Sequence, residues 1–193
     1  KKKHLFVAVD LNDLVERELF PFWILTFKRL VDAVEKSEIN GKIKKEIAAL
    51  FLDSIQSRNL FLTIENLRKA IILIVNNDIL PTVFFIRFDR LIGAVNEQFF
   101  ANLEGLIDLS GHKLAYVFTS FRTTSEVLPK LPRNFLQVFA NDIYIKPAKP
   151  ADSETIFKAL KKRYKISPKR GIVKKLIEVS GGHIQYLHLS IVI

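Results

Sequence analysis

Two apolar segments of the chain end in side chains that can bind a ligand. Thr82 to Phe88 is β-branched or aromatic at almost every position and is followed by Asp89. Leu114 to Phe118 has the same character and is followed by Thr119 and Ser120. If both segments are neighbouring parallel strands, their carboxylate and hydroxyl groups lie at the carboxyl edge of the sheet, where ligands bind in open α/β folds. The competing interpretation is structural, because Asp, Thr and Ser also cap helices and close turns.

A second candidate is a run of positive charge near the carboxyl end. The chain has 30 lysines and arginines against 20 acidic residues, a formal net charge of +10, which favours partners rich in phosphate. Nine cations and no acid occur between residues 158 and 175. This segment is either a solvated helix face or a contact surface for nucleic acid or another phosphate-bearing partner. The candidate contacts are Lys161, Lys162, Arg163, Lys165, Lys169, Arg170 and Lys174.

Other kinds of site have no support. The chain has no cysteine, and therefore neither disulfides nor thiolate metal sites. The four histidines are scattered, and His183 and His188 are five residues apart, which puts their rings on different faces of a helix. No G-x-S-x-G sequence indicates a serine hydrolase. The longest apolar run, around residues 20–27, is too short to span a bilayer.

The elements that must position these residues alternate between strand and helix up to about residue 147. A break is expected at Leu80-Pro81, Thr63 is expected to cap a helix, and Pro21 to kink a helix or to start a second one. The predicted strands cover residues 5–9, 82–88, 114–118 and 142–145, and the predicted helices cover 14–36, 43–55, 63–76 and 96–109.

After Lys146-Pro147 the pattern contains helices alone, starting near Asp152 or Ser153, near Ser167-Pro168, and after Gly181-Gly182 near His183. This order predicts an α/β fold: a parallel-sheet core over residues 1–149, followed by a small all-helical domain over 150–193.

Four segments together resemble one family, the P-loop ATPases of the AAA+/STAND kind, including archaeal, bacterial and origin-recognition ATPases. Residues 82–91, TVFFIRFDRL, resemble the Walker B strand, and residues 113–122, KLAYVFTSFR, resemble the neighbouring sensor 1 strand. Residues 180–189, SGGHIQYLHL, resemble the Gly-Gly turn and helix of the lid domain. The start, LFVAVDLNDL, resembles the second strand of these modules and the helix after it. The resemblance covers nearly the whole chain and implies ATP and Mg²⁺ as cofactors.

The resemblance also implies roles for individual residues. Asp89 would hold Mg²⁺ through water, and Thr119 and Ser120 would touch the γ-phosphate or the attacking water. Arg133, or Arg122, would be an arginine finger that reaches the γ-phosphate in a neighbouring subunit. His183 and Gln185 stand near the sensor 2 position, where the family has arginine. The structural alternatives are a surface arginine, a capping histidine and a surface glutamine.

Two departures from the family pattern bear on activity. The phosphate-binding loop, GxxxxGK[ST] (Walker A), occurs nowhere in the 193 residues. The strand that carries it would be missing too, which predicts a gap in the sheet with unpaired backbone groups. The Walker B segment is also irregular, because Asp89 is either the metal-binding acid followed by Arg90 in place of the catalytic glutamate, or only the later acid of the motif. In both alignments no carboxylate follows the metal-binding position, so hydrolysis is expected to be slow or absent.

The leading functional hypothesis is therefore a nucleotide-dependent switch module that binds ATP-Mg and acts on other domains or on subunits of an oligomer. The alternative is a non-enzymatic nucleic-acid-binding module with a degenerate nucleotide site and DNA as its partner. A third hypothesis is an interaction scaffold that exposes Phe20, Phe22, Trp23 and Phe27, although their helical spacing favours a place in the core. A cytoplasmic location without membrane attachment is expected.

Overall fold

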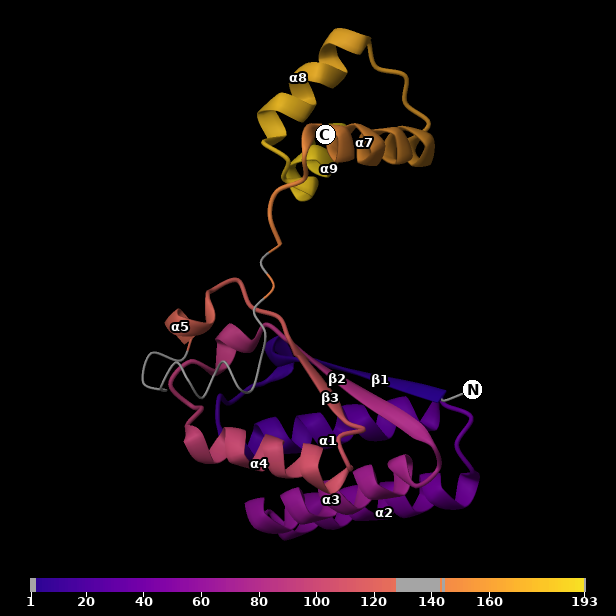
Figure 1. The fold of residues 1–193 in the computed structure, drawn as a ribbon, viewed down its shortest axis with the longest axis vertical. Helices are drawn as coiled ribbons and strands as arrows, with labels where there is room; N and C mark the ends of the chain where they lie inside the picture. The colour runs from indigo at the N-terminus through magenta and orange to yellow at the C-terminus, as the bar shows by residue number, and fades with distance from the viewer. Residues whose placement is uncertain (1–2, 128–142, 144, 193) are drawn as a thin grey trace. The chain divides into compact units, whose positions relative to one another are not determined.

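The computed structural model describes residues 3–127, 143 and 145–192 (Figure 1). The chain divides into two compact units, Lys1–Asn141 (unit 1) and Asp142–Ile193 (unit 2). Unit 1 is mixed α/β with a parallel sheet, as the sequence predicted, and the described part of unit 2 is helical. Among the described residues, no helix combines the length and apolar character needed to cross a membrane.

The sheet of unit 1 has three parallel strands in the order β1-β2-β3. The register pairs Val7 with Val83, and Val83 with Tyr116. Helices α1, α2 and α3 connect β1 to β2, while a short 3₁₀ turn, η2, and α4 connect β2 to β3. The bounds are β1 Lys3–Asp10, η1 Leu11–Asp13, α1 Leu19–Glu35, α2 Gly41–Ser57, α3 Leu60–Val75, β2 Ile79–Ile86, η2 Phe88–Leu91, α4 Glu97–Leu109, β3 Ala115–Phe118 and α5 Thr124–Val127.

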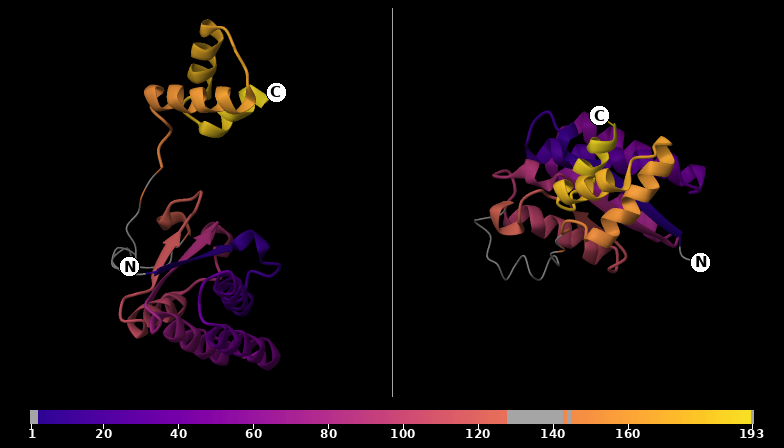
Figure 2. Two further views of the ribbon diagram at one scale, coloured as in Figure 1. Left: turned by 90° about the vertical axis from the view of Figure 1, so that its right-hand side faces the viewer. Right: turned by 90° about the horizontal axis from the view of Figure 1, so that it is seen from above.

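Helices α1 to α4 lie on one face of the sheet, as both the front and the turned views show (Figures 1 and 2). The core forms between them and the alternate strand residues that point toward this face. Its centre is aromatic: the ring of Phe22 in α1 lies 5.2 Å from Phe85 in β2 and 5.0 Å from Phe99 in α4. Phe22, Trp23 and Phe27 are all buried and belong to the core, and Phe20 is half-buried, so the four do not form an exposed aromatic surface.

The other face of the sheet is not covered by any element in the described part of unit 1. Phe6 is 64% exposed and Val117 is 39% exposed there. Exposed positions alternate with buried ones in β1 and with half-buried ones in β3. Right-handed crossovers that advance in one direction across a parallel sheet put all their helices on the same face. Parallel sheets normally have both faces covered. We therefore expect another segment or partner to pack against this apolar face.

Several element boundaries differ from those expected. Helix α3 begins at Leu60 and is capped by Asn59, whose side chain accepts the Leu62 N–H at 3.0 Å, whereas Thr63 lies inside the helix. Pro21 lies in the first turn of α1, where a proline costs no hydrogen bond.

The strand β2 begins earlier than expected, at Ile79, and includes Pro81. Pro81 precedes the first pair between β2 and β3, Thr82 with Ala115, so the strand has a hydrogen-bonding neighbour on only one side at this position. A missing N–H is tolerated there.

Two sequence predictions concern strands other than these three. The three described strands are contiguous, and the gap expected beside a missing strand stays a prediction. Ile143 and Ile145, the described residues of the strand expected at 142–145, lie in no strand and expose their side chains. A strand forms only where a neighbouring strand satisfies its backbone groups.

Unit 2 packs three helices against one another: α7 Pro150–Tyr164, α8 Arg170–Ser180 and α9 Ile184–Val192. Phe157 of α7 and Leu187 of α9 are buried between them. The turn between α8 and α9 uses two residues with positive φ, Gly181 at 56° and Gly182 at 80°. The Gly182 carbonyl accepts the Ala148 N–H at 2.9 Å, which ties the segment before α7 to this turn.

We expect Gly182→Ala to destabilise unit 2 by at least about 2 kcal/mol, because alanine disfavours this φ and its Cβ would lie 2.3 Å from the Ala148 carbonyl oxygen. Gly171→Ala is the matched control, since nothing lies within 4 Å of a Cβ there and alanine favours the first turn of α8. Amide hydrogen exchange of residues 150–192 measures both. Equal protection in the two variants would contradict the prediction.

Candidate functional site

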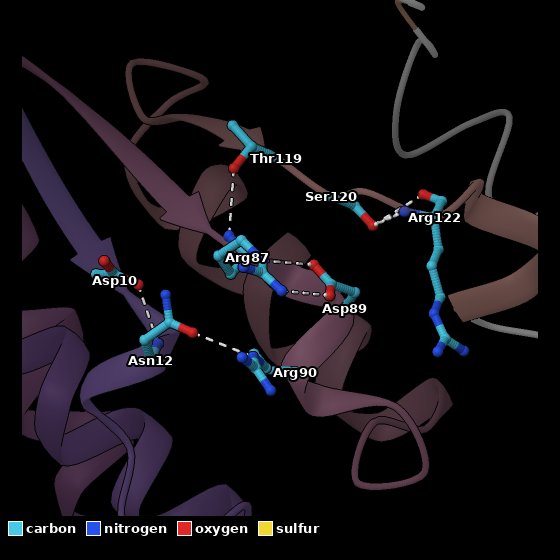
Figure 3. A network of polar contacts seen from close by, with 8 residues as sticks. All are labelled: Asp10, Asn12, Arg87, Asp89, Arg90, Thr119, Ser120 and Arg122. Atoms are coloured by element: carbon cyan, nitrogen blue, oxygen red, sulfur yellow. Dashed lines mark hydrogen bonds and ion pairs between the residues drawn. The ribbon is translucent and has the colours of Figure 1, made fainter. Parts of the chain in front are cut away.

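Parallel pairing brings the ends of all three strands to one edge. Asp10 is paired with Ile86, and Phe85 with Phe118, so the strands end nearly level. The residues at and after the strand ends make three groups of polar contacts, Asp10–Asn12–Arg90, Thr119–Arg87–Asp89 and Ser120–Arg122 (Figure 3). The structure thus brings Asp89 and Thr119, two residues singled out in the sequence, to the same edge of the sheet.

Arg87, the first residue after β2, has left-handed backbone geometry with φ 63°. A non-glycine residue in this region is uncommon and is often held there by its surroundings. Here the Arg87 N–H donates to the Thr119 hydroxyl at 3.2 Å. The Thr119 N–H donates to the Phe85 carbonyl at 2.9 Å, and the Thr119 carbonyl accepts the Phe88 N–H at 2.8 Å. Thr119 therefore fixes the turn that aims the Arg87 side chain.

The Asp89 carboxylate is bound by the Arg87 guanidinium. Nε donates to Oδ1 at 3.3 Å and Nη2 donates to Oδ2 at 3.2 Å, so both oxygens are engaged. Burial tends to raise the pKa of Asp89, whose side chain is only 10% exposed, but the hydrogen bonds and charge of Arg87, with the Phe121 backbone N–H, lower this pKa below its ordinary value. Asp89 is therefore ionised at neutral pH and paired inside the protein.

A second arginine links the ends of β1 and β2. Arg90 donates from Nε to the Asn12 side-chain oxygen at 3.1 Å, and the Asn12 N–H donates to the Asp10 carboxylate at 2.9 Å. Among the described residues no carboxylate lies within ion-pair distance of Arg90. Its charge is therefore not neutralised by a direct partner in this part of the chain.

Ser120 closes a turn. Its hydroxyl donates to the Arg122 carbonyl at 2.8 Å and accepts the Arg122 N–H at 3.0 Å. The next residue, Phe121, is 79% exposed, and the Arg87 guanidinium lies 4.4 Å from the centre of its ring, within the range of a cation–π interaction. Arg87 is thus held between a carboxylate and an aromatic ring.

Mg²⁺ is the ion that the resemblance implies at this edge, and the residues present do not fit it. Magnesium takes oxygen ligands in near-octahedral geometry, commonly from one or two carboxylates with free lone pairs. Both oxygens of Asp89 are hydrogen-bonded to a guanidinium, which also repels a divalent cation. The described residues hold no group of three potential metal ligands among Asp, Glu and His.

The remaining sequence-predicted residues are not part of the contacts described for unit 1. His183 and Gln185 are exposed in unit 2, and the His183 ring lies 4.8 Å from the ring of Tyr186. Arg133 lies outside the described residues, and so does the side chain of Arg170. His188, which the sequence left without a role, meets the Tyr164 hydroxyl at 2.6 Å between α7 and α9.

The basic residues of unit 2 are exposed on α7, α8 and the loop between them. Lys158, Lys161 and Lys162 recur at intervals of three and four residues and so share one face of α7, and Lys165 follows at its C-terminal cap. Cations in the last turn of a helix also stabilise it through its dipole. No ion pair to these lysines occurs among the described residues. The arrangement therefore suits both a solvated helix end and a contact with phosphates.

Two contributions to the site were not predicted from the sequence. Asn12 is 78 residues away from Arg90 along the chain, and no local pattern links them. Arg87 and Arg90 were visible only as departures from the resembled motif. The sequence shows that both residues are cationic, but it does not predict the left-handed turn that orients the Arg87 side chain.

Comparisons of the chain with models of protein families, with curated proteins and with solved structures gave no match. The resemblance to AAA+/STAND ATPases therefore rests on the motif-bearing residues and remains a prediction.

The Arg87–Asp89 pair predicts a pH-dependent contribution to the stability of unit 1. We expect Asp89→Asn to cost about 1–3 kcal/mol at neutral pH, because it leaves the guanidinium without its charged partner. A lowered carboxyl pKa stabilises the fold above the unfolded value, near 3.8, and that stabilisation is lost as the pH falls through the folded value. The difference between wild type and variant should therefore shrink below about pH 3.8.

Urea unfolding followed by the fluorescence of Trp23, the only tryptophan, measures this difference. Asp108→Asn is the control, since its carboxylate is 63% exposed and its removal should change stability little at any pH. A difference for Asp89→Asn that stayed constant down to pH 2 would show that the pair does not titrate as described.

Proposed function

We propose that the chain is part of a nucleotide-dependent switch of the P-loop type, which binds ATP and hydrolyses it slowly or not at all. Its sheet edge would receive the phosphates, and the helical unit 2 would serve as the lid. The bound state would be passed on to another domain or to a subunit of an oligomer. The observation that carries this proposal is the polar network at the carboxyl edge of a parallel sheet, the position at which α/β proteins bind nucleotides.

Three features support the proposal. Parallel strands with helical crossovers are the framework of this class of fold. Thr119, at the tip of β3, stands where the resembled family has a polar residue that senses the γ-phosphate. The Gly181-Gly182 turn leads into a helix, as in the resembled lid. The phosphate-binding loop would come from a segment with the GxxxxGK[ST] pattern, which these 193 residues lack.

Slow or absent hydrolysis follows from the charges at the edge. Activating a water molecule requires a free carboxylate or a comparable base near the γ-phosphate. Asp89 is paired with Arg87, and the residue after it is Arg90. A site with this composition would hydrolyse its bound nucleotide slowly, so the bound state would be long-lived, as a switch requires.

Isothermal calorimetry of the full-length protein tests the proposal. We expect ATP to bind with a dissociation constant of about 1–100 μM. Thr119→Val should weaken ATP more than ADP, because a γ-phosphate contact is made only by the triphosphate. The control is Thr155→Val, the same substitution at an exposed position of α7, which should leave the ATP-to-ADP affinity ratio unchanged. Absence of ATP binding by the full-length protein would rule the proposal out.

A second candidate function is nucleic-acid binding by unit 2, and the lysines of α7 favour it. Unit 2 carries eleven lysines and arginines against four acidic residues, which concentrates most of the net charge of the chain in 52 residues. Exposed cations on one helix face can follow the phosphates of a DNA duplex. The partner would be DNA, bound without a requirement for ATP.

The salt dependence of duplex DNA binding, measured by fluorescence anisotropy without nucleotide, tests this candidate. Replacing Lys158, Lys161, Lys162 and Lys165 by Gln should reduce the slope of log K against log salt by up to about 3–4, since each lost phosphate contact removes about 0.9. The control removes four exposed lysines of unit 1 (Lys36, Lys42, Lys45 and Lys69) and has the same net charge. Equal effects of both sets would show that only overall charge matters.

A further inference from the structure

The end of β2, at the carboxyl edge of the sheet, is followed by two arginines. Two guanidinium groups follow β2, those of Arg87 and Arg90 (Figure 3), and among the described residues only Arg87 of the two is paired with a carboxylate, that of Asp89. A Mg²⁺ ion at a nucleotide site is commonly held by one or two carboxylates together with the substrate phosphates. The composition of this edge therefore suits an anion and disfavours a divalent cation.

The two arginines after β2 are held in place by contacts that leave part of each guanidinium available. Arg87 uses Nε and Nη2 for Asp89 and lies against the ring of Phe121 at 4.4 Å. Arg90 uses Nε for Asn12 at 3.1 Å. The Arg90 N–H also donates to the Arg87 carbonyl at 2.9 Å, so the two residues belong to one tight turn. Positioning by neighbours lowers the entropy lost when a ligand binds.

Guanidinium is suited to this task by its chemistry. It is planar, remains charged at every physiological pH, and presents paired N–H donors that match the oxygens of a phosphate. It also supplies positive charge without water ligands that must be displaced. The charge that Mg²⁺ would bring to a nucleotide is thus already present on this edge as part of the protein.

We propose that Arg90 and Arg87 take the place of the divalent metal at the sheet edge, so that the protein binds the phosphates of a nucleotide without Mg²⁺. This inference rests on the proposed nucleotide-binding function and specifies how that site is charged. Arg90, whose charge has no carboxylate partner in the described part of the chain, makes the main contact. Arg87, whose guanidinium is also paired with Asp89, adds positive electrostatic potential to the site.

The test compares ATP binding to the full-length protein by calorimetry in excess Mg²⁺ and in excess EDTA. We expect the two affinities to agree within about threefold. Arg90→Gln should weaken binding about 10–100-fold under both conditions, the range for losing a hydrogen bond to a charged group. Arg90→Lys should recover only part of the lost affinity, because lysine restores the charge but not the paired N–H donors of a guanidinium. Tripolyphosphate, which has no base or sugar, should show the same dependence on Arg90.

The control is Arg58→Lys, which alters an exposed arginine at the C-terminal cap of α2 and should leave binding unchanged. Binding that requires Mg²⁺ would overturn this inference and leave the nucleotide function standing. Binding that is independent of Mg²⁺ but insensitive to both Arg90 variants would overturn the assignment of the contact. Absence of ATP binding under either condition would overturn both the inference and the proposed function.

Discussion

Parallel pairing of three strands is the constraint on which the rest of unit 1 depends. It sets all strand ends at one edge, so residues as distant in sequence as Asn12, Arg90 and Thr119 become neighbours. It also demands crossover connections, and these connections supply α1 to α4. The aromatic contacts of Phe22 with Phe85 and Phe99 then fix two of the helices on the sheet. Site and core are thus two consequences of the same pairing.

The Arg87–Asp89 pair shows how an arginine beside an acid changes the kind of ion that the sheet edge can bind. An acid with free oxygens after a buried strand would attract a metal ion, whereas the same acid bound on both oxygens by a guanidinium does not. The pair forms because Thr119, from the next strand, holds Arg87 in a left-handed turn. Its geometry therefore depends on the β2–β3 register, and the chemistry of the edge depends on the packing of the sheet.

The uncovered face of the sheet has a topological origin. Both connections advance in the same direction, from β1 to β2 and from β2 to β3, so both place their helices on the same side. A sheet covered on both faces needs a connection that reverses direction, and ligand sites in open α/β folds lie where this reversal occurs. Exposed Phe6 and Val117 mark the face that the described part of unit 1 leaves open.

Local chemistry alone determined much of this protein. Apolar runs of β-branched and aromatic residues predicted the three strands, helical periodicity predicted most helices of both units, and Asn40 and Asn96 cap α2 and α4 as polar residues before apolar helices do. The pairing of Asp89 with Arg87, the bond between Asn12 and Arg90, and the place of Pro81 inside β2 could not be predicted, because each depends on which strand lies beside which. Ile143 and Ile145, the described residues of the strand expected at 142–145, lie in no strand. Extended structure is stabilised by a neighbouring strand, and which strand lies beside it is a property of the tertiary structure.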